Sequence, residues 1–187
     1  MGELALEGIL LARHAESTWN AERRWQGQGD PPLSALGRTQ AAALARELQP
    51  RGVGAVVASD LLRAAETAEI VGAVLGVRVR LDARLRERDV GTWSGLLHEE
   101  IVRLHAAELD LLRSGDPAVR PGGGETSRAL EVRVRAALAE IAADRASSPV
   151  AVITHLGVIR VLEADARVGN ASVWEPGRGR SGGVQIA

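Results

Sequence analysis

The stretch from residue 53 to residue 82, VGAVVASDLLRAAETAEIVGAVLGVRVRLD, decides the fold class. Its two ends, 53–59 and 77–82, are rich in valine and predict two strands. Residues 60–76 between them have apolar side chains at helical spacing, and Ser59 or Asp60 can cap the first turn. Strands that alternate with helices in this way are typical of a parallel sheet, because parallel neighbours need a crossover connection.

The flanking sequence continues this alternation on both sides. Apolar runs predict strands at 8–12 and 149–155 and edge strands at 171–176 and 183–187. Helical periodicity predicts helices at 34–48, 96–114, 125–146 and 156–164, the first of them capped by Ser34 and stopped by Pro50 and Gly52. Turn residues predict a loop at 176–183. We therefore predict one α/β domain over residues 1–187, a three-layer sandwich with a mostly parallel central sheet flanked by helices.

Composition excludes several kinds of chemistry. The chain has 187 residues, of which 45% are hydrophobic and 25% charged, as expected for one globular domain. It contains neither lysine nor cysteine, which excludes a lysine-dependent phosphate loop, a Schiff base, a thiolate nucleophile and a thiolate zinc site. The net charge of −1 gives no general field for nucleic acid. Without a signal-like N-terminus or a long apolar run, we expect a cytoplasmic protein that does not enter a membrane.

Polar residues that follow the predicted strands indicate the site. Arg13 and His14 follow the first strand, Arg63 lies one turn into the helix after the second, and His155 ends the late strand. Ligands of such sheets bind beyond the carboxyl ends of the strands. Two histidines and two arginines, with no carboxylate cluster beside them, favour a phosphate dianion over a metal ion. A histidine would then be the nucleophile, because imidazole keeps an unprotonated nitrogen at neutral pH.

Five blocks of sequence resemble a known family. They are LARHAESTWN at 11–20, RWQGQGDPPLSALGRTQA at 24–41, ASDLLRAAETA at 58–68, LRERDVGTWSG at 85–95 and ITHLGVIR at 153–160. In this order they resemble the signature blocks of the histidine phosphatase superfamily, the phosphoglycerate-mutase-like enzymes. The resemblance implies a phosphoglycerate-mutase-like fold and phosphoryl transfer through a phosphorylated histidine.

The resemblance also implies a role for each matching residue. His14 matches the nucleophile, Glu87 the proton donor, and His155 a second histidine that binds phosphate and stabilises the charge that develops during transfer. The residues that match phosphate ligands, besides His155, are Arg13, Asn20 and Arg63. The residues expected to contact the rest of the substrate are Gln26, Gly27 and Leu156.

Each of these residues also has a plainer interpretation. Considered alone, they would be a surface turn at Arg13 and His14, a helix cap at Asn20, an exposed helical Arg63, a hydrogen-bonded core His155, and a Glu87 paired with Arg84, Arg86 or Arg88. Two positions depart from the family, which usually has glycine at both. Ala15 is tolerable there if its φ is negative, whereas Leu156 would narrow the pocket or shift His155.

Three further features are interpreted as structural rather than catalytic. His98 and His105 lie seven residues apart on one predicted helix and are expected to be solvated, because the residues around His98 miss the metalloprotease pattern. The three glycines at 122–124 are expected to let the chain pass between helices, with a role as a lid over the substrate left open. Trp19 and Trp25 are expected to pack within the protein, although stacking on a ring of the substrate is also open.

The function expected from these residues and from the resemblance is that of a metal-independent phosphomonoesterase acting on a small phosphorylated metabolite without a cofactor. A cofactor-dependent phosphoglycerate mutase is the first alternative, although family mutases are generally longer. A phosphate-binding regulator without turnover is the second. The only expected partner is the small-molecule substrate, with neither nucleic acid nor membrane involved, and a homodimer stays possible.

Overall fold

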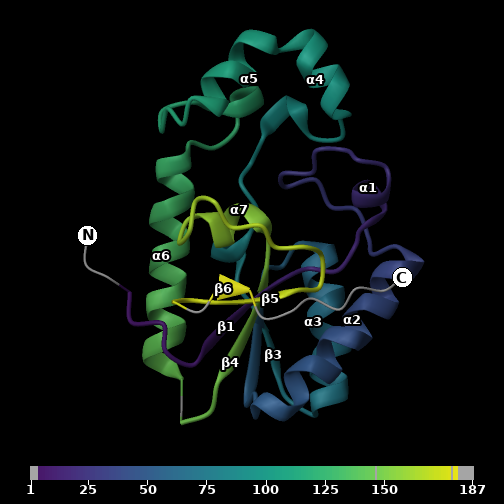
Figure 1. The fold of residues 1–187 in the computed structure, drawn as a ribbon, viewed down its shortest axis with the longest axis vertical. Helices are drawn as coiled ribbons and strands as arrows, with labels where there is room; N and C mark the ends of the chain where they lie inside the picture. Colours follow the sequence, from purple (N-terminus) through teal and green to yellow (C-terminus); the bar gives the residue numbers. More distant parts are fainter. Residues whose placement is uncertain (1–3, 146, 178, 181–187) are drawn as a thin grey trace.

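The computed structural model describes residues 4–145, 147–177 and 179–180, and one six-stranded sheet runs through its centre (Figure 1). The strands are β1 (Ile9–Arg13), β2 (Ala55–Ala58), β3 (Val79–Leu81), β4 (Val150–Thr154), β5 (Val173–Glu175) and β6 (Gly179–Arg180). Their order across the sheet is β3-β2-β4-β1-β5-β6. Strands β1 to β4 are parallel, and β5 and β6 add an antiparallel edge. The predicted mostly parallel sheet is confirmed.

Helices cover both faces of this sheet. They are α1 (Thr18–Ala21), α2 (Ala35–Leu48), α3 (Leu62–Leu75), α4 (His98–Leu104), α5 (Ala106–Arg113), α6 (Ser127–Asp144) and α7 (Leu156–Arg160), with 3₁₀ turns at 49–51, 83–85, 91–93 and 121–123. Helices α2 and α3 pack on one face, and α6 and α7 on the other (Figure 1). All five residues of β4 are buried, because a strand covered on both faces must be apolar throughout. The three-layer prediction is confirmed.

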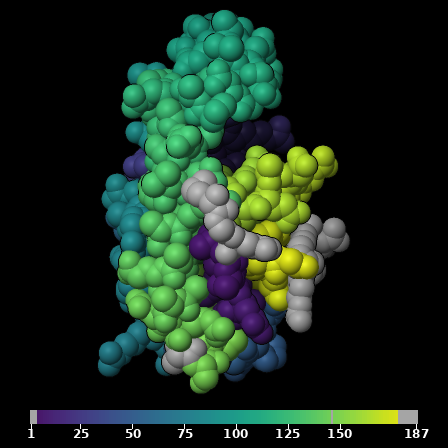
Figure 2. Space-filling view, turned by 90° about the vertical axis from the view of Figure 1, so that its left-hand side faces the viewer, coloured from purple at the N-terminus to yellow at the C-terminus, as the bar shows by residue number. Residues whose placement is uncertain are grey.

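The two faces of the sheet use side chains of different size. On the face of α2 and α3, alanines such as Ala41 and Ala68 are completely buried and let the helices approach the strands closely. On the face of α6, larger residues such as Leu138 and Ile141 fill the space against β1 and β4. Figure 2 shows α6 along this side of the molecule, with α4 and α5 above it. None of the helices in the described residues is long and apolar enough to cross a membrane.

The single helix predicted at 96–114 is wrong, because the chain breaks at His105. This residue has φ −135° and ψ 33°, so α4 ends and α5 begins there. Ile101 and Leu109 both bury against one small cluster that contains Trp93. Eight residues of straight helix span about 12 Å, so the bend at His105 lets both side chains reach the same cluster.

The predicted cap of the helix after β2 is also wrong. The N-cap residue of α3 is Leu61, which makes no side-chain cap. The Leu62 N–H instead donates to Asp30 Oδ1 at 2.5 Å, from a loop thirty-two residues earlier in the chain. Asp60 is engaged elsewhere, in an ion pair with Arg86 at 2.6 Å. Because Asp30 is distant in sequence, local spacing could not reveal this cap.

The C-terminal region differs from its prediction in two described elements. Strand β5 confirms the predicted edge strand at 171–176, but Gly179–Arg180 forms β6 within the segment predicted as a loop. The predicted edge strand at 183–187 lies outside the described residues. The helix predicted at 156–164 is shorter than expected, because α7 ends at Arg160.

Candidate active site

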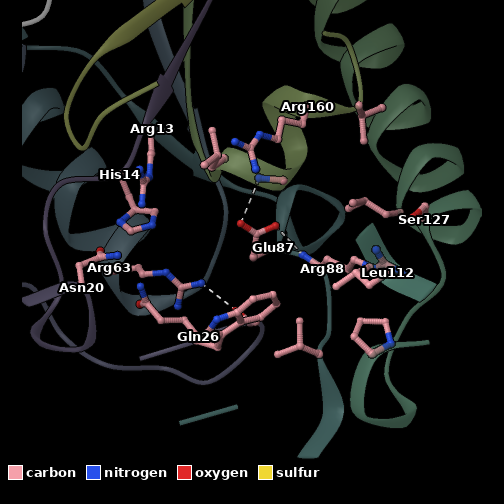
Figure 3. Close-up of a pocket in the computed structure, with 18 of the residues that line it drawn as sticks. Arg13, His14, Asn20, Gln26, Arg63, Glu87, Arg88, Leu112, Ser127 and Arg160 are labelled. Carbon is pink, nitrogen blue, oxygen red and sulfur yellow. Dashed lines mark hydrogen bonds between the residues drawn. The ribbon is translucent and has the colours of Figure 1, made fainter. Parts of the chain in front are cut away.

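A cavity of about 750 Å³ opens at the carboxyl ends of the parallel strands (Figure 3). The predicted residues that line it are Arg13, His14, Asn20, Gln26, Gly27, Arg63, Glu87 and Leu156. His155 is the one predicted residue that is not part of the wall. Its ring is buried beside that of His14, with the ring centroids 5.1 Å apart. The fold therefore brings together side chains from β1, α3, β4 and the loop after β3.

The tautomer of His14 is determined by a backbone contact. Its Nδ1 lies 2.7 Å from the carbonyl oxygen of Ala15. A carbonyl can only accept, so Nδ1 carries the hydrogen and Nε2 keeps its lone pair. Burial, together with the positive charges of Arg63 and Arg13, lowers the pKa of His14 well below its ordinary value. The imidazole is thus neutral at pH 7 with Nε2 unprotonated, as a nucleophile requires.

His155 follows β4 and is completely buried, yet within the described chain neither of its ring nitrogens has a hydrogen-bond partner. The interpretation as a hydrogen-bonded core histidine is therefore wrong. Burial and the neighbouring Arg63, His14 and Arg13 lower its pKa well below the ordinary value. A buried polar group without a partner is costly, and such groups concentrate at functional sites. A ligand oxygen would satisfy it.

Two guanidinium groups, the buried Arg63 and the half-buried Arg13, join His14 and His155 in a cluster of four residues that we call the cradle. Arg63 donates to the carbonyl oxygens of Gly29 and Gly27 at 2.7 and 2.8 Å, and Arg13 donates to that of Val168 at 3.0 Å. The Nε atoms of both arginines are buried without a partner among the described residues. Burial lowers the pKa of Arg13, and that of Arg63 to about 10. Two desolvated cations without an ion-pair partner in that part of the chain form a site for an anion.

Asn20 caps a helix and also lies at the cavity wall. Its Oδ1 accepts from the N–H and the hydroxyl of Ser17, both at 3.1 Å, and so caps α1. The same oxygen accepts from Asn170 Nδ2 at 3.2 Å, and that nitrogen also reaches the His14 carbonyl at 3.1 Å. Asn20 nevertheless lines the cavity, so the cap holds its amide in place at the wall. Asn170 belongs to none of the five family-like blocks, and sequence reasoning missed it.

The carboxylate of Glu87 is held by two backbone N–H groups rather than by an arginine (Figure 3). Oε1 accepts from the N–H of Arg88 at 2.8 Å and Oε2 from that of Gly157 at 3.1 Å. The candidate ion-pair partners are engaged elsewhere: Arg84 pairs with Asp82 and Glu140, Arg86 pairs with Asp60, and Arg88 donates to the carbonyls of Val119 and Glu125. The interpretation of Glu87 as one half of an ordinary ion pair is therefore wrong.

Gly157, two residues after His155, is the glycine that allows the backbone to approach the Glu87 carboxylate. A Cβ on Gly157 would lie 2.1 Å from Glu87 Oε1, so only glycine allows this approach. Leu156, the departure noted in the sequence, lines the cavity and packs against the core of the α6 face. The other departure, Ala15, is buried without a positive φ, and its N–H donates to Thr67 Oγ1 at 3.1 Å. The condition for tolerating alanine there is met.

The three glycines at 122–124 do more than let the chain pass. A Cβ on Gly122 would lie 2.3 Å from the Val90 carbonyl, and one on Gly124 would lie 2.3 Å from that of Asp89. Their backbone therefore packs directly on the loop that follows Glu87. Only residues without side chains permit such close contact between two backbones.

Of the two remaining histidines, one is exposed as expected and the other is only partly exposed. His98 is exposed but accepts from Trp25 Nε1 at 3.3 Å, and the two rings are stacked. His105 is half-buried, 5.7 Å from the ring of Trp93. The predicted packing of Trp25 is confirmed, because it meets Trp93 edge-on at 5.5 Å while also lining the cavity. No group of three metal-ligating side chains occurs within the described residues.

Several residues that sequence reasoning did not single out also line the cavity. They are Arg24, Arg88, Val90, Leu112, Pro121, Ser127, Leu130, Glu131, Arg160 and Val161. Arg24, Arg88 and Arg160 lie inside the five family-like blocks, and this location is the only feature of the sequence that could indicate that they line the cavity. Those from α5 and α6 lie outside the blocks and reach the site only through the fold.

Comparison with known proteins agrees with this geometry. The model of the histidine phosphatase superfamily (branch 1) matches residues 9–177. The chain belongs to the histidine phosphatase superfamily. The resemblance of the five blocks is therefore confirmed, and this histidine phosphatase is a phosphoric monoester hydrolase.

Relatives of this histidine phosphatase carry several names. The glucosyl-3-phosphoglycerate phosphatase of Mycobacterium tuberculosis is 38% identical over 164 residues, covering 83% of this chain and 73% of the relative. The phosphoglycerate mutase-like protein 4 of Arabidopsis thaliana is 39% identical, with 85% and 70% covered. Among solved structures, mycobacterial glucosyl-3-phosphoglycerate phosphatase complexed with VO3 has a TM-score of 0.80 at 36% identity, with 88% of both chains covered. Bacillus stearothermophilus YhfR has a TM-score of 0.81 at 30% identity, with 95% of both covered.

The two buried histidines make stability depend on pH. In the unfolded chain both titrate near 6.5, whereas both pKa values are much lower in the folded protein. Below pH 6.5 the unfolded chain takes up protons that the folded protein does not, so the free energy of unfolding falls by up to about 1.4 kcal/mol per pH unit for each histidine. Urea titrations between pH 8 and pH 5 measure this fall.

Added inorganic phosphate should recover part of the lost stability, because it binds only the folded state. A His155→Gln variant should show about half the pH dependence. The lowered pKa values of Asp60 and Asp82 act only below their ordinary value of 3.8 and do not interfere. A free energy of unfolding that stays constant from pH 8 to pH 5 in wild type would contradict the assignment of two neutral buried histidines.

Proposed function

We propose that this histidine phosphatase hydrolyses its ester through a phosphohistidine formed on His14. The observation that carries the proposal is the state of that ring: Nδ1 donates to the Ala15 carbonyl, so the lone pair of Nε2 is free beside two arginines whose Nε atoms are buried. An anionic phosphoryl group would repel an anionic nucleophile but does not repel a neutral imidazole. The neighbouring cations without an ion-pair partner in the described residues can neutralise the phosphoryl charge.

The reaction proceeds in two displacements. Nε2 of His14 forms a bond to phosphorus while the ester P–O bond breaks, and the leaving oxygen takes the electron pair together with a proton from the protonated carboxyl of Glu87. The Glu87 carboxylate then accepts a proton from water, whose oxygen attacks phosphorus as the P–N bond breaks. Inorganic phosphate leaves, and Nε2 recovers its lone pair.

The remaining cradle residues bind the phosphoryl oxygens. Arg13, Arg63 and His155 carry the buried nitrogens without partners among the described residues, and we assign these atoms to the oxygens that bear the transferred charge. Asn20, held by its cap, supplies its amide at the wall. Because these donors are buried before substrate arrives, little reorganisation is needed during transfer.

For the substrate, we propose a phosphorylated metabolite with a polar organic part, and glucosyl-3-phosphoglycerate is the first candidate. The cavity of about 750 Å³ is much larger than a phosphate ion. Beyond the cradle, its wall includes Arg88, Arg160 and the indole of Trp25, groups suited to a carboxylate and a sugar ring. The names of the mycobacterial relatives support the same candidate. Gln26, Gly27 and Leu156 are assigned to substrate contacts on this basis.

A panel assay in excess EDTA tests the proposal. Wild type should release inorganic phosphate from p-nitrophenyl phosphate without added metal, and should prefer glucosyl-3-phosphoglycerate over 3-phosphoglycerate and glucose 6-phosphate in kcat/KM. Loss of turnover with EDTA that Mg²⁺ restores would contradict the metal-independent mechanism. Equal kcat/KM for all the natural esters would contradict the proposed substrate class.

A phosphoglycerate mutase is the second candidate, because other relatives carry that name, among them a probable phosphoglycerate mutase of Enterobacter sp. that is 39% identical over 132 residues. The same assay separates the two. A mutase converts 3-phosphoglycerate to its 2-phospho isomer in the presence of the bisphosphate and releases little free phosphate, whereas the hydrolase releases phosphate. A regulator without turnover would bind phosphate but do neither.

Localisation in the cytoplasm stays a prediction. The same holds for assembly, and light scattering of the purified protein would distinguish a monomer from a homodimer.

A further inference from the structure

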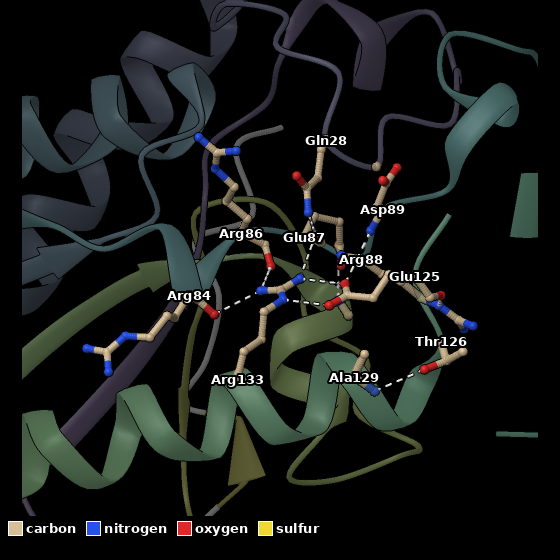
Figure 4. A network of polar contacts seen from close by, with 12 residues as sticks. Gln28, Arg84, Arg86, Glu87, Arg88, Asp89, Glu125, Thr126, Ala129 and Arg133 are labelled. Atoms are coloured by element: carbon tan, nitrogen blue, oxygen red, sulfur yellow. Dashed lines mark hydrogen bonds and ion pairs between the residues drawn. The ribbon is translucent and has the colours of Figure 1, made fainter. Parts of the chain in front are cut away.

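Glu87 ends the segment 84–87, which starts within the 3₁₀ turn at 83–85 and then continues without regular secondary structure (Figure 4). Such a segment lacks the ladder of hydrogen bonds that holds a strand or a helix in place. Its half-buried carbonyl groups must therefore find partners elsewhere. Those partners identify what determines the position of the Glu87 carboxylate.

Most of them belong to one side chain, that of Arg133 on α6. Nη1 donates to the carbonyls of Arg84 and Arg86 at 2.8 and 2.6 Å, and Nη2 donates to that of Glu87 at 2.9 Å. Nε and Nη2 also donate to the two carboxylate oxygens of Glu125 at 2.8 and 2.7 Å. A guanidinium has five N–H donors, and here all five are used. Figure 4 shows the group enclosed between the loop and Glu125.

Glu125 connects the same network to the glycine-rich turn. Its N–H donates to the Asp89 carbonyl at 2.9 Å, and its own carbonyl accepts from Arg88 Nε at 2.8 Å. The side chains of Glu125 and Arg133 are 15% and 20% exposed, so their ion pair is shielded from water and from salt. Residues on both sides of Glu87 are thus attached to the N-terminal part of α6.

The remaining carbonyl of the segment is held by the strand of the second histidine. Thr154, which precedes His155, donates its hydroxyl to the Leu85 carbonyl at 2.9 Å. All four carbonyls from Arg84 to Glu87 therefore accept from side chains, three of them from Arg133. None of these contacts involves the Glu87 carboxylate itself or the cavity, whose lining does not include Arg133.

We propose that Arg133, held by Glu125, is the positioning residue for the proton donor: it fixes the loop so that the Glu87 carboxylate points at the leaving oxygen. This inference rests on the proposed function, in which Glu87 protonates that oxygen. Arginine is required because its planar fork addresses three carbonyls and a carboxylate at once, whereas lysine has three donors on a single nitrogen. Displacing a reacting group by about 1 Å can cost on the order of a hundredfold in rate.

The test uses leaving groups of different basicity. p-Nitrophenolate leaves without protonation, whereas the alkoxide of 3-phosphoglycerate needs a proton donor. We compare kcat/KM, which reports the steps up to release of the alcohol, for wild type, Glu87→Gln, Arg133→Met, Arg133→Lys and Glu125→Gln. Arg128→Met is the matched control, because Arg128 lies exposed on the same helix.

For Arg133→Met we expect kcat/KM with 3-phosphoglycerate to fall about thirtyfold or more, and with p-nitrophenyl phosphate by less than about threefold. Arg133→Lys and Glu125→Gln should show the same selectivity with smaller losses. The Kd for vanadate, measured by calorimetry, should change by less than about threefold, because the cradle is built from other residues. Circular dichroism and melting curves establish folding, and if Arg133→Met does not fold, the two milder variants decide.

The outcomes separate the inference from the function on which it rests. If Glu87→Gln loses both substrates equally, its role as proton donor fails, and the proposed function must be revised. If Glu87→Gln shows the selective loss while folded Arg133 and Glu125 variants do not, only the positioning role is overturned. Equal loss of both substrates, or loss of vanadate binding, in those variants would also overturn it, because it would indicate general damage to the site.

Discussion

Replacing His14 with alanine should reduce kcat for any phosphomonoester by a factor of at least about 10⁴, since no other side chain can accept the phosphoryl group. Within the described residues, His14 lines the cavity and its tautomer is determined by a hydrogen bond, so its Nε2 carries the lone pair that can attack phosphorus. We do not expect His155 to replace it, because no contact in the described residues determines which of its ring nitrogens keeps a lone pair. The measurement is steady-state release of phosphate in excess EDTA.

Two further observations make this prediction specific. After a rapid quench in base, wild type should carry phosphate that is stable to base and labile to acid, and His14→Ala should carry none. Glu87→Gln should accumulate this label from p-nitrophenyl phosphate, because water attack then lacks its base. His105→Gln is the control and should retain wild-type turnover, because His105 lies outside the cavity wall. A His14→Ala protein that turns over like wild type would refute the assignment of the nucleophile.

Replacing Arg63 with methionine should have the second-largest effect, a fall of about 10³ in kcat/KM. Removing one preorganised donor to a developing negative charge costs roughly a hundredfold to a thousandfold. Arg63 also anchors the loop that contains Gly27, a residue of the cavity wall, through its bonds to the carbonyls of Gly27 and Gly29. Met keeps the length and the apolar stem of the side chain, so the loss reports the guanidinium itself.

The response of Arg63→Lys distinguishes charge from geometry. Lysine restores the charge, but it lacks the planar guanidinium that directs one donor at each of the two carbonyls. We therefore expect kcat/KM of Arg63→Lys to be only about tenfold higher than that of Arg63→Met. The Kd for vanadate should weaken in Arg63→Met, in contrast to the positioning variants at Arg133. Arg38→Met is the matched control, because the Arg38 side chain is exposed, lies outside the cavity wall and pairs with Glu66 at 2.7 Å. Unchanged vanadate affinity in Arg63→Met would show that Arg63 does not bind the phosphoryl group.

Removing Arg63 has a second consequence for the other cradle residues. Its charge is among the causes that lower the pKa values of His14 and His155. Both pKa values should therefore rise in Arg63→Met, and stability should become less sensitive to pH between 8 and 5 than in wild type. The two effects on rate and on titration have one cause, which is the desolvated charge of a single side chain.

Local patterns were sufficient for most of the fold. The buried strand β4 and the helix α2 with its Ser34 cap depend on neighbours within a few residues, so periodicity and capping predict them. The chain order of strands and helices then places Arg13, His14 and His155 at one edge of the sheet. Where the deciding contact comes from afar, local reasoning fails, as at the cap of α3 by Asp30 and the break at His105.

The sequence by itself determined which residue types could do chemistry and which strand ends would carry them. Without lysine or cysteine, and with two histidines and two arginines at one edge, a phosphate site was the predicted outcome. Only the tertiary structure decided the state of these groups: the tautomer of His14, the unpartnered nitrogens of His155, and the attachment of the Glu87 loop to Arg133. The physical reason is that secondary structure follows from short-range spacing, whereas burial, charge and hydrogen-bond partners depend on residues that meet only after folding.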